Sequence, residues 1–347
     1  LRSRWLIWAL AGVCAGLGHL SRADGLLLVL VGWAAALPTL RRSPWRCLGG
    51  LLIFSLAYLL VMLPWLLRMQ SVSGAPLTVG GLQSIVFTGY DDLFNYPPGA
   101  SLSDFLAQGW RAIVLTRLQA LAVGLGTLIA VEGLIVLAPF MLLGLWRRRH
   151  LVILRPFWLY ALGLHLVMTL VFAHPGMRGG LFHSAAALMP FWMVLGLAGL
   201  YDAIDWVAAR RSHWHAPTAR SVFTVALLLI ALALSLSVSL PRRFMAGTPA
   251  LYTELSSNLP SDALIMVNDP AQLYYYTGLS SVVIPNAAPA VIPAIAARYQ
   301  VTHLLIEDLN GGAAVPLRFA FDLDDPPDFL RVIPLSTPGV RLYAIEP

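Results

Sequence analysis

Residues 221–240 read Ser221-Val-Phe-Thr-Val-Ala-Leu-Leu-Leu-Ile-Ala-Leu-Ala-Leu-Ser-Leu-Ser-Val-Ser-Leu240, a stretch without a charged side chain. A helix needs about 20 mainly apolar residues to cross the ~30 Å hydrocarbon core of a bilayer, so this stretch predicts a membrane-spanning helix. Further stretches of the same character bring the number of predicted spans to about seven, at 5–20, 26–40, 48–67, 119–145, 157–173 and 181–201. The first two are short, and a single hairpin dipping into the bilayer is an alternative for them.

The composition agrees with a polytopic α-helical membrane protein. The 347 residues are 58% hydrophobic and 12% charged, with a mean hydropathy of +0.74. Soluble domains carry roughly 25% charged residues, so this composition excludes a soluble globule, a disordered chain and a coiled coil. The two cysteines, Cys14 and Cys47, lie in or beside apolar stretches and exclude a disulfide scaffold.

The charges divide the chain into two parts. Residues 1–240 carry 17 arginines and 7 acidic residues, a balance of +10, whereas residues 241–347 carry 6 and 10, a balance of −4, which together give the net charge of +6. The arginines are spread between apolar stretches rather than clustered on a solvated face, which argues against nucleic-acid binding. We therefore expect a membrane domain over 1–240 and a soluble domain over 241–347.

Arginines in the connecting segments predict the orientation. They precede the first span, follow the second, fourth and sixth spans, and by the positive-inside rule lie in the cytoplasm. The loops at 21–25, 68–118 and 174–180 and the C-terminal domain are then extracytoplasmic, and the N-terminus is cytoplasmic. Arg242 and Arg243, just beyond the last span, are a small exception.

The C-terminal domain has the alternating pattern of an α/β fold. Strands are expected at 264–267, 282–284, 303–306, 330–334 and 340–345, with helices at 270–277 and 289–299. This alternation predicts a largely parallel sheet. In the long loop 68–118, a short helix is expected to start near Ser103. No glycine-rich phosphate-binding sequence opens a helix, so the pattern does not indicate nucleotide binding.

Glu132 is the clearest polar residue at membrane depth, within Ile129-Ala-Val-Glu-Gly-Leu-Ile135. Charged groups there are costly and are functional candidates. The alternative is a polar clamp between helices, with His165 or a backbone group as its partner.

Three further groups could carry chemistry at the extracytoplasmic face. Arg178, followed by two glycines and His183, stands at the expected start of a helix, where free N–H groups and an arginine favour an anion such as a phosphate. The alternative is a plain loop with an interfacial anchor. Arg22 and Asp24 form the turn between the first two spans, with an ordinary ion pair as the alternative. The adjacent Asp91 and Asp92 could bind a divalent metal or act as a base, or could cap a turn.

Some of these stretches resemble the GT-C superfamily of polytopic glycosyltransferases, in particular family 39 and its neighbours, the protein mannosyltransferase-like and aminoarabinose transferase-like proteins. The run His19-Leu-Ser-Arg-Ala-Asp-Gly-Leu-Leu-Leu28 resembles their Leu-x-Arg-x-(Asp/Glu)-Gly-Leu stretch, and Met177-Arg-Gly-Gly-Leu-Phe-His183 through Pro190 resembles an arginine-containing helix start. Tail segments also resemble their extracytoplasmic domain, at Asn268–Leu279, Val283–Asn286 and Ala297–Leu305.

The resemblance implies a membrane glycosyltransferase that moves a sugar from a polyprenyl-phosphate donor to an extracytoplasmic protein, lipid or glycan acceptor. It implies donor-phosphate binding by Arg178 and also by Arg22, with His183 and Asp24 as further donor-binding candidates, although Gly179 stands where the family has a tyrosine. The family's catalytic acidic loop would lie upstream of Leu1, so we expect a fragment without activity of its own, with Asp91 and Asp92 as weak substitutes.

No cofactor is implied beyond room for a divalent metal. The expected location is a bacterial cell membrane. There are two alternatives from other functional classes. One is a transporter or flippase-like permease, which the intramembrane Glu132 favours, and the other is a non-catalytic glycan-binding membrane protein.

Overall fold

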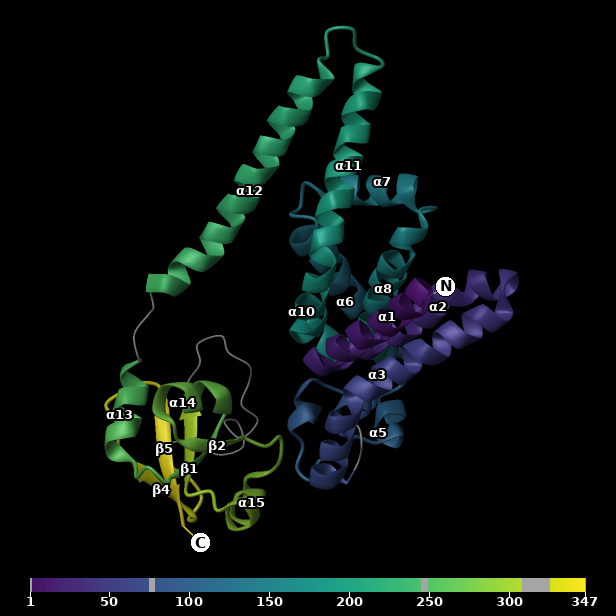
Figure 1. Ribbon diagram of the computed structural model, residues 1–347. Coiled ribbons are helices and arrows are strands. Elements are labelled where there is room, and N and C mark those ends of the chain that lie inside the picture. The colour runs from purple at the N-terminus through teal and green to yellow at the C-terminus, as the bar shows by residue number, and fades with distance from the viewer. Residues whose placement is uncertain (1, 75–78, 245–248, 308–324, 347) are drawn as a thin grey trace. The chain divides into compact units, whose positions relative to one another are not determined.

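The computed structural model describes residues 2–74, 79–244, 249–307 and 325–346, and the chain divides into two compact units (Figure 1). The membrane unit comprises Leu1–Val86 and Leu102–Val238. The C-terminal unit comprises Phe87–Ser101 and Ser239–Pro347.

The membrane unit is helical. Six of its described segments are long and apolar enough to cross a bilayer, at Ala23–Arg42, Pro44–Val72, Trp110–Glu132, Val152–Val171, Ala173–Ala208 and Ala216–Leu240. A shorter apolar helix covers Trp5–Ser21. By length and composition the chain is therefore a multi-pass membrane protein. The α-helices of this unit are α1 (Arg2–Ser21), α2 (Leu27–Arg42), α3 (Pro44–Ser73), α4 (Val79–Gln83), α5 (Leu102–Ala107), α6 (Trp110–Gly126), α7 (Ala138–Arg148), α8 (Arg155–Leu166), α9 (Ala173–Pro175), α10 (Leu181–Ala185), α11 (Met189–Ala208) and α12 (Ala216–Phe244).

The span predicted at 119–145 is wrong as one continuous helix. Helix α6 starts earlier, at Trp110, and continues as a π-helix to Glu132, after which the chain turns before α7 begins at Ala138. In this turn Leu134 and Ile135 adopt left-handed φ values of 45° and 63°. The hydropathy of the sequence does not reveal this break in the helix, because both residues are apolar.

The loop predicted at 174–180 is also wrong. Helix α8 passes into a π-helix over Val167–Val171, and helical turns continue through α9 and a further π-helix over Gly176–Gly180. Backbone dihedrals leave helical values at Phe172, between the first π-helix and α9, and at Arg178 and Gly179. The polar residues of this stretch therefore lie at a kink within a helical segment.

Glycines allow the helices of the membrane unit to pack closely. A Cβ atom at Gly12 of α1 would lie 2.1 Å from the carbonyl oxygen of Phe54 in α3. One at Gly199 of α11 would lie 2.0 Å from the carbonyl oxygen of Phe140 in α7. Small residues at membrane helix interfaces permit this approach of the backbones.

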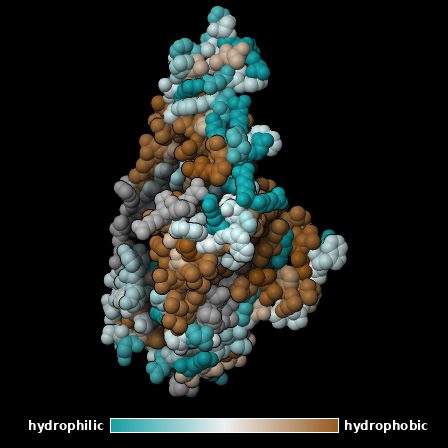
Figure 2. Space-filling view, turned by 45° about the vertical axis from the view of Figure 1, so that its right-hand side comes forward, coloured by the Kyte–Doolittle hydropathy of each residue, from teal (hydrophilic) through white to brown (hydrophobic). Residues whose placement is uncertain are grey.

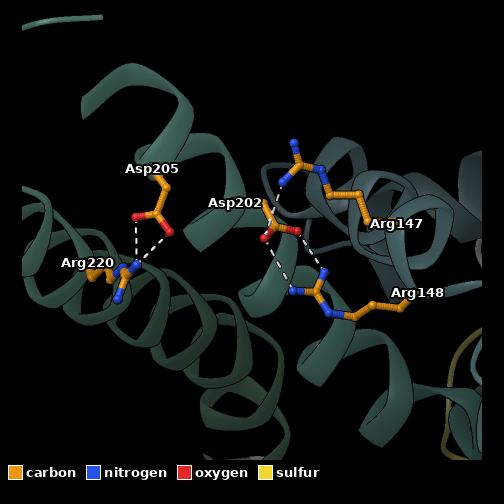
Figure 3. A network of polar contacts seen from close by, with 5 residues as sticks. All are labelled: Arg147, Arg148, Asp202, Asp205 and Arg220. Atoms are coloured by element: carbon orange, nitrogen blue, oxygen red, sulfur yellow. Dashed lines mark hydrogen bonds and ion pairs between the residues drawn. The ribbon is translucent and has the colours of Figure 1, made fainter. Parts of the chain in front are cut away.

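Ion pairs connect the ends of α7, α11 and α12 (Figure 3). Asp202 contacts Arg147 at 3.5 Å and Arg148 at 2.7 Å, and Asp205 contacts Arg220 at 2.6 Å. These arginines follow predicted spans four and six, so part of the predicted cytoplasmic positive charge is paired with carboxylates at the end of α11.

Apolar side chains cover much of the outer surface of the membrane unit, and brown areas are extensive in Figure 2. The most buried of the six long spans, Ala173–Ala208, has only 39% of its apolar window buried, and Ala216–Leu240 has none. Such surfaces require a hydrocarbon solvent, because soluble monomers rarely expose large contiguous apolar patches.

The C-terminal unit contains a five-stranded sheet of order β2-β1-β3-β5-β4. Its strands are β1 (Leu264–Val267), β2 (Ser280–Val283), β3 (His303–Glu307), β4 (Leu330–Ile333) and β5 (Val340–Ile345), and its helices are α13 (Ala250–Asn258), α14 (Pro270–Thr277) and α15 (Ile292–Tyr299). The expectation of a largely parallel sheet is confirmed only for part of it: β1 pairs with β2 and β3 in parallel, whereas β5 runs antiparallel to β3 and to β4. The short connection between β4 and β5 permits a hairpin but not the crossover that parallel strands need.

Both faces of this sheet are covered. Leu251 and Leu255 of α13 pack with Leu273 of α14 on one face, while Ile292 and Ile295 of α15 belong to the core on the other face. Strands β1, β3, β4 and β5 therefore contribute buried side chains to at least one core, and β2 contributes the partly buried Val282.

The segment 87–101 packs within the C-terminal unit, although the sequence placed it in the loop 68–118 of the membrane domain. Asn95 accepts a 2.7 Å hydrogen bond from the side chain of Asn286, and the carbonyl oxygen of Phe94 accepts one of 2.7 Å from the Asn286 amide. Two segments separated by four long spans thus form one unit.

Candidate functional site

Arg22 joins two of the sequence-predicted groups. Its guanidinium Nη2 donates to the carbonyl oxygen of Gly180 at 3.3 Å, and its Nε donates to the hydroxyl of Ser184 at 3.1 Å. Ser184 in turn donates to the same Gly180 oxygen at 2.9 Å. The turn after α1 and the segment that carries Arg178 and His183 therefore meet in the membrane unit, and we call this contact the Arg22 site.

Asp24 completes the Arg22 site. Its Oδ1 lies 3.1 Å from Arg22 Nε, and its side chain is only 7% exposed whereas that of Arg22 is 43% exposed. His19, which interacts electrostatically with Asp24, has its Nδ1 2.7 Å from the hydroxyl of Tyr58. The predicted Arg22–Asp24 ion pair is thus present, and it leaves the outer side of the guanidinium open to solvent or ligand.

The kink places Arg178 and His183 on the surface of the same segment. Gly179 has a φ of 104°, a left-handed value that favours glycine, and the preceding Arg178 is exposed. The exposed His183 ring lies 3.6 Å from where a Cβ at Gly179 would be. Because Gly180 bonds Arg22 directly, Arg178 lies two residues from that contact.

Two arginines contribute to this group. Arg22 is paired with Asp24, and the exposed side chains of Arg178 and His183 lie on the segment that Arg22 contacts. Arginine recognises phosphate oxygens through parallel N–H groups, so the arrangement suits an anionic group with oxygen acceptors.

A second polar group lies in the interior of the membrane unit and consists of Glu132, His165 and Trp192, which we call the Glu132 cluster. Glu132 is fully buried; its Oε2 accepts a 2.6 Å hydrogen bond from Trp192 Nε1, and its Oε1 lies 3.0 Å from His165 Nε2. His165 Nδ1 lies 2.8 Å from the carbonyl oxygen of Ala161.

The Ala161 carbonyl fixes a hydrogen on one ring nitrogen of His165. It can only accept, so Nδ1 carries a hydrogen, and Nε2 faces the carboxyl group of Glu132. The pairing with His165 was one of the partners considered from the sequence, whereas Trp192 was not expected, since an indole in an apolar helix gives no polar signal.

Asp91 and Asp92 lie in the C-terminal unit, at the start of a short 3-10 turn over Asp91–Phe94. Asp92 accepts hydrogen bonds from the backbone amides of Thr88 and Gly89 and from the side chain of Asn95. Burial pulls the pKa of the Asp92 carboxyl upward, but these hydrogen bonds outweigh it and lower the pKa below its ordinary value. The Asp92 carboxylate therefore stabilises a turn, which is the second of the two roles considered from the sequence.

Within the described ranges, no group of three or more His, Cys, Asp or Glu side chains is arranged to hold a metal ion. Searches of protein-family models, curated proteins and solved structures find no match to this chain.

Proposed function

We propose that this protein takes part in transferring a sugar from a polyprenyl-phosphate-linked donor to an extracytoplasmic protein, lipid or glycan acceptor. The observation that supports the proposal is the Arg22 site, in which Arg22 bonds Gly180 and Ser184. Two segments 158 residues apart meet there, and both carry residues that the sequence resemblance assigns to the donor phosphate.

The chemistry of the reaction needs a cationic group at this place. When the sugar leaves, its bond to the phosphate breaks and the phosphate gains negative charge, while the anomeric carbon develops oxocarbenium character. Fixed donors that meet this charge lower the barrier, and one such donor is typically worth a factor of about 10²–10³ in rate. Arg22 is held in place by Asp24, Gly180 and Ser184, so it reaches the phosphate with little reorganisation.

We propose an orientation with the Arg22 site and the C-terminal unit outside the cytoplasm of a bacterial cell. The packing of 87–101 within the C-terminal unit supports it, because both parts of that unit must then lie on one side of the bilayer. The long segments between residues 101 and 239 provide an even number of crossings: Trp110–Glu132, Val152–Val171, Ala173–Ala208 and Ala216–Leu240. Tags after Arg147 and at residue 347 should report opposite sides, and labelling from the same side would refute the orientation.

A transfer assay tests the proposed activity. Membranes from cells that express the full-length gene are supplied with a radiolabelled polyprenyl-phosphate sugar, and label in acceptor material is counted. Arg178→Ala and Arg22→Gln should each reduce transfer at least 100-fold with normal membrane insertion. Arg41→Gln, which removes an exposed arginine near the other end of α2, should leave transfer unchanged. Wild-type transfer by both site variants would contradict the proposal.

The Glu132 cluster favours a second candidate, a proton-coupled permease, because titratable groups inside a membrane often belong to proton paths. The variant Glu132→Gln distinguishes the permease from the transferase. A permease would lose substrate uptake with this variant, whereas a transferase would keep its activity, since the Glu132 cluster is separate from the Arg22 contacts.

A further inference from the structure

The membrane unit contains a groove of about 620 Å³ between α6, α7 and α8. Nearly all of its lining is apolar, with Leu125 of α6, Leu142 of α7 and Leu162 of α8 as examples. Leu162 and Leu142 are each 54% exposed, so the groove opens to the outside of the unit. An apolar groove in a membrane-spanning part has access to lipid chains rather than to water.

The length of the groove matches one leaflet of a bilayer. Its lining along α8 and the π-helix that follows runs from Trp158 to Thr169, eleven residues apart, which corresponds to about 16 Å at about 1.5 Å per residue. The hydrocarbon core is ~30 Å thick, so a leaflet contributes about half of that. The groove therefore fits an acyl chain that enters from the Trp158 end.

A cation lies at that end. Arg149 lines the groove, and its guanidinium is stacked over the Trp146 ring at 3.9 Å and donates to the Trp146 carbonyl. The neighbouring Arg147 and Arg148 are paired with Asp202 (Figure 3). No carboxylate of the described part of the chain pairs with Arg149, although it is the third arginine of the same run.

We propose that this groove binds one anionic glycerophospholipid from the leaflet that contacts residues 147–155. Its phosphodiester pairs with Arg149, and one acyl chain lies between α6 and α8. Basic pockets between membrane helices are suited to lipids with anionic head groups. The lipid is distinct from the proposed sugar donor, because Arg149 lies toward the start of α8 and the Arg178 segment follows its end. The inference therefore does not depend on the proposed function.

Native mass spectrometry of the full chain tests this binding. The protein is released from mixed micelles that contain phosphatidylglycerol and phosphatidylcholine with identical acyl chains, and bound lipids are counted. Wild type should retain one phosphatidylglycerol with a preference of about 5–10-fold, the range expected for one arginine near the head groups.

Three variants locate the site. Arg149→Gln should abolish the preference, and Leu162→Trp, which fills the groove from an exposed position, should reduce the retention of both lipids. Arg46→Gln is the matched control, because Arg46 is exposed and is expected on the same side of the membrane; it should behave as wild type. The proposal is overturned if wild type shows no preference, or if Arg46→Gln lowers it as much as Arg149→Gln. If a variant fails to fold, the lipid preference of the wild-type protein still decides whether the proposal stands.

Discussion

The contacts of the Glu132 cluster make a sharp prediction about stability. Glu132→Ala removes the acceptor of the 2.6 Å hydrogen bond from Trp192 and the 3.0 Å contact with His165. Trp192 is 4% exposed, so no water replaces the lost acceptor at the indole N–H. The imidazole Nε2 also loses its partner in an apolar surrounding.

The magnitude follows from two polar groups left unpaired. Each buried unsatisfied group costs about 1–3 kcal/mol. Hydrogen bonds between membrane helices average only about 0.6 kcal/mol, which favours the lower part of this range. We therefore expect Glu132→Ala to lower the free energy of unfolding by about 2–4 kcal/mol.

Glu132→Gln should be much milder. Its amide oxygen can accept from Trp192, and its amide N–H can donate to the neutral Nε2 of His165, whose Nδ1 already donates to Ala161. This arrangement mimics the neutral form of the pair, so we expect a change within about 1 kcal/mol of wild type.

Unfolding by sodium dodecyl sulfate in mixed micelles, followed by far-UV circular dichroism, measures both variants. Trp192→Phe removes the indole donor together with part of the buried ring, so its free energy of unfolding should also lie below that of wild type. The reasoning fails if Glu132→Ala has the same free energy of unfolding as wild type. It also fails if Glu132→Gln is as unstable as Glu132→Ala, because the charge of the carboxylate would then be required.

Three other predictions concern packing, ion pairs and pH. Gly199→Leu should destabilise the membrane unit by about 1–3 kcal/mol, because its Cβ would meet the Phe140 carbonyl oxygen, whereas Gly163→Ala, with open space around it, should be silent in the same unfolding titration. Asp202→Asn should cost no more than about 1 kcal/mol, since its arginine partners are partly exposed; a larger loss would mean that the pair is more deeply buried than its geometry indicates. Burial raises the pKa of the Glu307 carboxyl, so stability of the C-terminal unit should fall as pH rises from about 4.5 through the raised pKa. Glu307→Gln should remove this fall, which hydrogen exchange of C-terminal peptides at pH 4 and pH 8 would reveal, and equal pH dependence in both proteins would contradict it.

Six of the predicted spans overlap described segments that are long and apolar enough to cross a bilayer, because span length and apolar composition are local properties, whereas the first corresponds to the shorter helix Trp5–Ser21. The failures of the sequence-based prediction lie where the backbone departs from a continuous helix. At Leu134 and Ile135 the backbone becomes left-handed, and neither apolar side chain signals a turn. Glycine at 179 and 180 indicates a break, yet helical turns continue on both sides of the kink because the segment packs against α6 and α8.

The C-terminal strands are predicted within two residues, since their apolar runs are short and bounded by prolines, glycines and polar residues. The direction of β5 is not, because pairing of β3 with β5 joins residues far apart in the chain, such as Leu305 and Leu342. The same limit applies to the candidate site. The sequence identifies Arg22, Asp24, Arg178 and His183 as separate groups, and only the fold joins Arg22 to the Arg178 segment.

Photocrosslinking tests the proposed donor site most directly. The full chain in vesicles is irradiated with a polyprenyl phosphate that carries a photoreactive group next to the phosphate, and the modified peptides are identified by mass spectrometry. We predict adducts within residues 19–25 and 176–186, with their loss in Arg178→Ala. Adducts confined to residues 146–158, or adducts that persist unchanged in Arg178→Ala, would contradict the assignment.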